Sequence, residues 1–110
     1  MSKQPHVSKV DHTGITVSSL EDALHFWVDV LGFEIIMRDK FAPGEFLTQV
    51  TGVAGCGVEL AMVNRGDHTI ELLQYSAPDG ARTYRPRPCD IGSLHGCPDG
   101  TMVQFWQPPQ

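Results

Sequence analysis

The chain has 110 residues, a formal net charge of −5 and a hydrophobic content of 41%, which is typical of one globular domain with a modest core. It has no basic run, which argues against a nucleic-acid partner, and no apolar run near the roughly 20 residues that span a bilayer. The N-terminus lacks the apolar core of a secretory signal, and the three cysteines form no CxxC pair. We therefore expect a cytoplasmic protein without disulfides or a zinc ribbon.

The first predicted strand covers residues 10–17 and is indicated by alternation. Its side chains divide into two faces: Asp11, Thr13, Ile15 and Val17 on one, and His12, Gly14 and Thr16 on the other. Ile15 and Val17 give the first face an apolar character. The second face is polar and contains a glycine, which suits a cleft, so His12 is the first candidate site residue.

A helix is predicted to follow this strand. Ser18 and Glu21 have capping-box spacing, which predicts that Ser18 is the N-cap. An apolar stripe follows at helical spacing: Leu20, Ala23, Leu24, Trp27 and Leu31. Gly32 can adopt the left-handed conformation that ends a helix, and residues 33–37 are β-rich and apolar. In such a strand–helix–strand unit the helix covers one face of the sheet. The other face is then free to curve around a ligand.

Residues 38–57 are predicted to form a long connection with a short helical turn around residues 46–50. Long connections within compact domains are often binding loops or lids. A plain surface excursion is the alternative, and the residues do not decide between the two.

An antiparallel hairpin is predicted from residues 58–64 and 68–75, with a turn at 64–67 in which Gly66 supplies a positive φ. In its second strand Glu71 shares a face with Leu73 and Tyr75. A carboxylate between apolar neighbours is costly unless it is paired or bound to a metal. Glu71 is therefore the second candidate, with a solvated strand glutamate as the alternative.

Residues 76–88 are predicted to be a linker that carries three arginines, Arg82, Arg85 and Arg87. They could clamp a substrate anion, or they could simply be solvated. Beyond them, residues 90–95 are predicted to form a short strand that ends at His95, residues 98–100 a turn, and residues 101–106 a last strand that includes Gln104.

Four segments together resemble the vicinal oxygen chelate superfamily: VDHTGITVSSLEDALHFWVDVLGFEI, VELAMVNRGDHTIELLQY, RPCDIGSLH and PDGTMVQFWQP. This superfamily groups glyoxalase I, methylmalonyl-CoA epimerase, extradiol dioxygenases, and the fosfomycin- and bleomycin-resistance proteins. The resemblance implies an α+β fold, in which a βαβββ module forms a cupped mixed sheet with a helix on its outer face.

The same resemblance implies a single domain over residues 1–110, with a first module at about 7–75, a linker at 76–88 and a partial second module at 89–107. The second module is short, because only Gly96 and Cys97 separate His95 from Pro98. Either this is a natural deletion or part of the chain is missing from the sequence. A homodimer could supply the missing wall of the cup.

By resemblance, a divalent metal (Zn, Ni, Mn, Co or Fe) is held by His12, Glu71, His95 and Gln104. Imidazole and carboxylate ligands suit these metals and leave positions for substrate oxygens. Gln104 stands where many members have an acid, and an amide oxygen can ligate but cannot act as a base. Glu71 is then the carboxylate that remains for catalysis.

The implied function is that of a metal-dependent lyase or isomerase resembling glyoxalase I or the epimerase. It would act on a small substrate with adjacent oxygens through an enolate-type intermediate. Two alternatives stay open: a metal-free drug-binding protein of the bleomycin-resistance type, and an extradiol dioxygenase.

Overall fold

The computed structural model describes residues 7–76, 87 and 89–91. It contains a four-stranded mixed sheet with the order β1-β4-β3-β2. The strands are β1 (Thr13–Thr16), β2 (Glu34–Phe41), β3 (Val58–Arg65) and β4 (His68–Tyr75). β1 runs parallel to β4, and the other neighbours are antiparallel. This arrangement confirms the predicted α+β fold.

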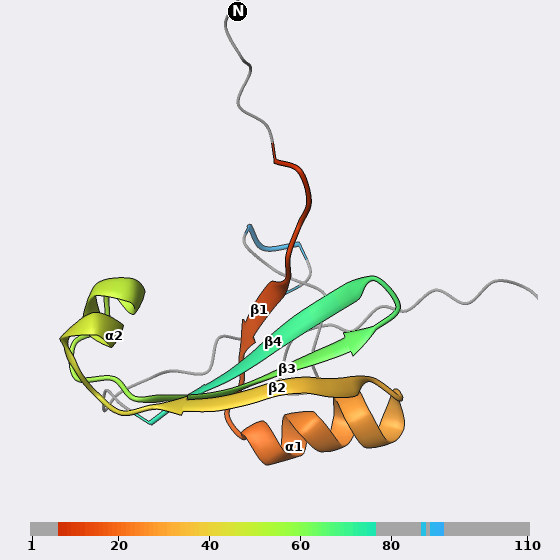
Figure 1. Ribbon diagram of the computed structural model, residues 1–110, viewed down its shortest axis with the longest axis horizontal. Coiled ribbons are helices and arrows are strands. Elements are labelled where there is room, and N and C mark those ends of the chain that lie inside the picture. The colour runs from red at the N-terminus through yellow and green to blue at the C-terminus, as the bar shows by residue number, and fades with distance from the viewer. Residues whose placement is uncertain (1–6, 77–86, 88, 92–110) are drawn as a thin grey trace, which may run out of the picture.

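Two helical segments lie on opposite sides of this sheet (Figure 1). On one side, α1 (Leu20–Leu24) continues into a π-helical segment, η1 (His25–Val30). On the other side, α2 (Glu45–Thr51) stands near one end of the sheet. Most of the second face is therefore left uncovered by the described residues, as the strand–helix–strand pattern predicted. No helix among the described residues is long and apolar enough to cross a membrane.

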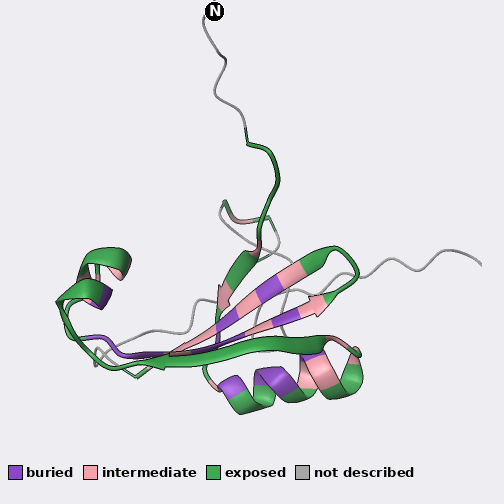
Figure 2. Cartoon of the chain, in the orientation of Figure 1, coloured by how far each residue is buried: buried purple, intermediate pink, exposed green. Residues whose placement is uncertain are grey.

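The main core lies between α1 and the sheet. Leu20, Ala23, Leu24 and Trp27 of the predicted stripe are buried there, against Leu72 and other sheet residues, and Figure 2 shows this buried face of the helix. Leu31 is partly buried and packs against the same cluster. Burial of this stripe, more than helix propensity, stabilises so short a helix.

The cap prediction is wrong by one residue. Ser19 is the N-cap, and its Oγ accepts a hydrogen bond from the backbone N–H of Asp22 at 3.2 Å. The Ser18–Glu21 spacing also fits a capping box in sequence, but Leu20 is buried and its N–H donates to Gln74 Oε1 at 2.7 Å, which favours a helix that begins at Leu20. The predicted end is confirmed, because Gly32 follows the last turn with a φ of 80°.

β2 is longer than the sequence predicted. Residues 38–41, assigned above to a loop, pair with β3 as far as Phe41 opposite Val58. A register shift lies between Ile35 and Met37, and three charged residues follow it, Arg38, Asp39 and Lys40. This charged run, which has no apolar alternation, is why the residues after 37 do not read as a strand. The helical turn predicted at residues 46–50 is confirmed within α2.

The hairpin is confirmed with a tighter turn than predicted. Arg65 pairs with His68, so only Gly66 and Asp67 form the loop, and Gly66 has the expected positive φ of 62°. Most of the predicted linker and partial second module lies outside the described residues, so their boundaries stay predictions. The strand predicted at residues 90–95 does not begin at its first two residues, because Asp90 and Ile91 lie in a turn in which Asp90 N–H donates to Arg87 O at 3.0 Å.

Candidate functional site

The sheet face opposite α1 is called the open face here. Side chains of directly paired residues in neighbouring strands share a face, so the register orders this surface into rows. One row crosses all four strands: Gly14, Glu71, Met62 and Met37. The next row contains Thr16, Leu73, Leu60 and Asp39. The predicted polar face of the first strand therefore joins the Glu71 face of the hairpin.

His12 and Glu71 are brought together on this face. His12 Nε2 lies 3.5 Å from Glu71 Oε1, and the two side chains are 31% and 18% exposed. Gly14 lies directly beside Glu71 in the register, and a Cβ at Gly14 would stand 3.6 Å from Glu71 Oε1. The glycine thus keeps the space beside the carboxylate open.

Asp11 holds the other side of the His12 ring. Its Oδ2 lies 2.7 Å from His12 Nδ1, and Lys9 Nζ lies 3.8 Å from Asp11 Oδ1. The hydrogen bond to Asp11 raises the pKa of His12 above its ordinary value, partial burial opposes this, and the charge of Glu71 adds to the increase. The hydrogen bond to His12, together with Lys9, lowers the pKa of Asp11.

The position of Asp11 differs from the sequence prediction, which placed its side chain on the Ile15 face. β1 begins only at Thr13, so strand alternation does not govern Asp11. An acidic residue next to a candidate histidine was the available signal for this contact. A carboxylate on the second ring nitrogen is a common way to orient a metal-binding histidine.

We expect Asp11→Asn to lower the pKa of His12, because an amide cannot provide the negative charge that favours the protonated ring. The pKa is measured from the pH dependence of the His12 ring proton shifts by NMR, on protein freed of metal with a chelator. An unchanged His12 pKa in this variant would contradict the contact with Asp11.

The His12–Glu71 pair fits a divalent metal. Two ligands of one tetrahedral ion, each about 2.0–2.1 Å from it, lie about 3.3 Å from one another, close to the 3.5 Å observed. When Nδ1 carries the proton toward Asp11, Nε2 and the carboxylate face each other as two acceptors. That arrangement is favourable only with a cation or a proton between them. The described residues contain no group of three or more His, Cys, Asp or Glu that could hold a metal, so they supply only this pair.

The other predicted ligands, His95 and Gln104, lie outside the described residues, as do Arg82 and Arg85 of the predicted anion clamp. Arg87 is described, and its Nη2 donates to Asp90 Oδ1 at 2.9 Å. This contact also lowers the pKa of Asp90. The guanidinium of Arg87 is thus already hydrogen-bonded to a carboxylate three residues away.

Met62, Met37 and Asp39 also lie on this face near the pair, and they were not among the residues predicted from the sequence. Met62 lies directly beside Glu71, and Met37 lies beside Met62. The missed signal is the alternation of Met37, Asp39 and Phe41, which resumes after the register shift and places these residues on the open face.

Comparisons with known proteins show which family this chain resembles. A family model described as the Glyoxalase/Bleomycin resistance protein/Dioxygenase superfamily matches residues 9–106, a range that includes all four predicted ligands. A 2-epi-5-epi-valiolone epimerase from Actinomyces sp is 34% identical over 96 residues, which cover 83% of this chain and 51% of that protein. The chain therefore spans about half the length of this curated relative.

Among solved structures, a glyoxalase family protein from Bacillus cereus is similar, with a TM-score of 0.67 and 26% sequence identity. The similarity covers 86% of this chain and 62% of that chain. It supports the same sheet and helix arrangement that the register shows.

Proposed function

Because the chain belongs to the glyoxalase/bleomycin resistance protein/dioxygenase superfamily, we propose that it forms a metal-dependent isomerase or lyase acting on a small oxygenated substrate. The ligands would be His12 and Glu71, completed by His95 and Gln104. The observation that carries this proposal is the approach of His12 Nε2 to Glu71 Oε1 at 3.5 Å, on a sheet face that the described residues leave largely uncovered. The similar protein named an epimerase favours isomerisation over the drug-binding and dioxygenase alternatives.

Each residue of the pair would have a distinct role. Asp11 holds the His12 ring so that Nε2 faces Glu71. Glu71 Oε1 faces the histidine as a ligand, and its second oxygen could accept a proton from a substrate carbon and return it. When bound, a divalent ion would polarise a substrate carbonyl and make the adjacent C–H more acidic.

Further metal ligands are needed besides His12 and Glu71, which are the two that the described residues supply. Two donors from one sheet leave a metal with positions for further ligands and for substrate oxygens. His95 and Gln104, or a second copy of the chain, would fill some of them. We therefore also propose that the chain forms a homodimer. Separately, we propose a cytoplasmic location, as expected from the sequence.

Metal analysis of the full chain tests this proposal. The protein is treated with chelator, given excess Zn²⁺, Mn²⁺ or Co²⁺, desalted, and measured by elemental analysis. Wild type should retain a stoichiometric amount of at least one ion, and His12→Ala should retain none. The control is His68→Ala, because His68 is an exposed histidine at the hairpin turn, on the face away from Glu71. His68→Ala should retain the same amount of metal as wild type.

Two results would overturn the proposal. One is wild-type protein that holds no divalent ion, and the other is full metal content in His12→Ala. Metal-free wild type that binds a planar aromatic cation would favour the drug-binding alternative instead.

A further inference from the structure

We infer that the substrate of this site carries an apolar group beside its metal-chelating oxygens, and that this group lies on Met62 and Met37. The inference rests on the proposed function, since it assigns the metal to His12 and Glu71. It adds the chemical class of the part of the substrate that does not react.

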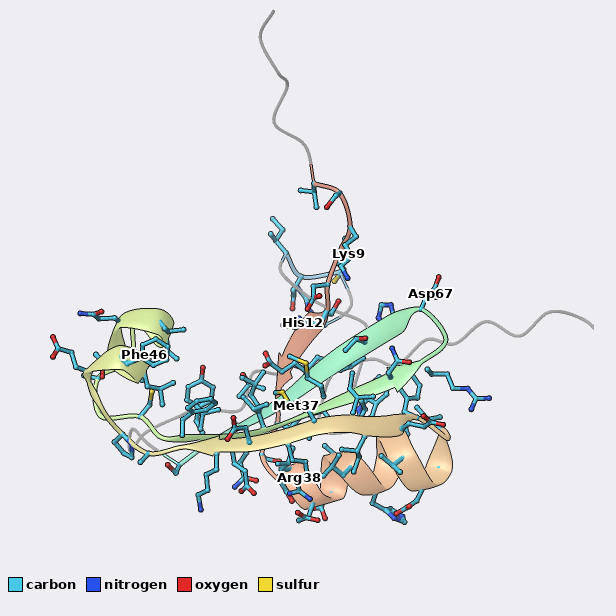
Figure 3. All side chains as sticks on the ribbon, viewed as in Figure 1. Lys9, His12, Met37, Arg38, Phe46 and Asp67 are labelled. Atoms are coloured by element: carbon cyan, nitrogen blue, oxygen red, sulfur yellow. The ribbon has the colours of Figure 1, made fainter. Side chains whose placement is uncertain are left out.

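The row that contains Glu71 continues across the sheet through Met62 and Met37. Neighbouring strands lie about 4.8 Å apart, so Met62 begins about 5 Å from Glu71 and Met37 about 10 Å from it, in the same row. This is the length of a six-membered ring with a substituent. Figure 3 shows Met37 on the open side of the sheet with His12, whereas its neighbour Arg38 lies on the side of α1.

The surface beside Glu71, called the floor here, is apolar and consists of Met62, Met37, Leu73 and Phe41. Met37 is 40% exposed and Phe41 is 37% exposed, while Met62 and Leu73 are partly buried. Exposed apolar side chains next to a candidate site mark a ligand surface more often than scattered ones do. Methionine is flexible and polarisable, so it adapts to ligands of varied shape.

Polar groups around the floor are few or already hydrogen-bonded. Asn64 lies one row away, but its amide already donates to His68 O and Thr69 Oγ1 at 3.1 and 2.8 Å. The charged side chains in the two neighbouring rows, Asp39 and Glu34, are both acidic. Among the described strand residues of the open face there is no lysine or arginine. This surface therefore offers little to a phosphate or carboxylate group.

The probes are mandelate and glycolate, which share an α-hydroxycarboxylate that chelates a metal and differ by a phenyl group. Their dissociation constants are measured by calorimetry on metal-loaded full chain. We expect mandelate to bind about 10-fold more tightly, because partial burial of a phenyl ring at about 25 cal/mol per Å² readily supplies that factor. Met62→Gln and Met37→Gln should reduce this preference to less than about 3-fold and leave glycolate binding unchanged.

Two further variants define the result. Met37→Leu keeps the apolar surface and should keep the preference. Val30→Gln replaces an apolar side chain that is 61% exposed but lies at the end of η1, on the other side of the sheet. It should have no effect.

The outcomes separate this inference from the proposed function. If the protein holds no metal, the proposed function is wrong and the inference falls with it. If it holds metal but binds the two probes equally, only the inference is overturned, and the floor is then covered by another part of the chain or by a second copy. The inference would also be overturned if wild type, Met62→Gln and Met37→Gln all showed the same preference for mandelate over glycolate.

Discussion

Replacing Glu71 by glutamine should weaken divalent-metal binding by about 100-fold or more and leave the folded protein as stable as before. The variant keeps the size of the side chain but removes its negative charge, and an amide oxygen is a weaker ligand than a carboxylate. Loss of residues that merely orient ligands already lowers metal affinity by 10–100-fold, so loss of a charged ligand should lower it at least as much.

Stability should not fall, because Glu71 is only 18% exposed and a carboxylate at such a position loses hydration on folding. The variant relieves that loss and retains the strand. At a pH above the raised pKa of His12, where the ring is neutral and gains nothing from the charge of Glu71, the free energy of unfolding from urea titration of metal-free protein should be equal to that of wild type or slightly higher. Metal affinity is measured in parallel by competition with a coloured chelator.

Glu59→Gln is the matched control for this experiment. Glu59 is also a strand glutamate, but it lies beside Gln74 on the α1 side, where Arg38 Nη2 is 3.5 Å from its Oε2. Its replacement should not change metal affinity. Equal losses in the two variants would indicate a general effect of charge and would contradict the role of Glu71 as a ligand.

Replacing Leu72 by alanine should lower the free energy of unfolding by about 3–4 kcal/mol, the range of buried leucine truncations. Leu72 is 0% exposed and lies in the cluster that joins α1 to the sheet. Domains of this size are stable by only about 5–15 kcal/mol, so this one change should remove a large part of the total. Urea unfolding followed by circular dichroism measures the loss.

Leu73→Ala is the comparison within the same strand. Leu73 points to the open face and is only partly buried, against the cluster that includes Leu47 of α2. Its truncation removes less packing and should lower stability by about 1–2 kcal/mol. Similar losses at the two positions would contradict the assignment of the two faces.

Local periodicity predicted much of this fold. The helical stripe from Leu20 to Trp27 is buried as expected, and the alternation in β4 places Glu71 and Leu72 on opposite faces. Gly32 and Gly66 stand at the predicted breaks with positive φ. These features depend on neighbours within a few residues, and a single sequence contains that information.

The errors arise where a distant partner decides the structure. Residues 38–41 form a strand because β3 pairs with them, although three of the four are charged. Ser19 caps α1, and the burial of Leu20 together with its hydrogen bond to Gln74 favours this helix start over one at Ser18. Asp11 turns to His12 because β1 begins two residues later.

The candidate site divides in the same way. By itself, the sequence determined which side chains carry metal-binding chemistry and which face of a strand each occupies, because both depend on residue type and on a period of two. The tertiary structure alone decided that β1 lies parallel to β4, so that His12 meets Glu71, and that the methionines of β3 and β2 continue the same row. Pairing between strands far apart in the chain depends on the packing of the whole sheet against α1, and no local pattern encodes it.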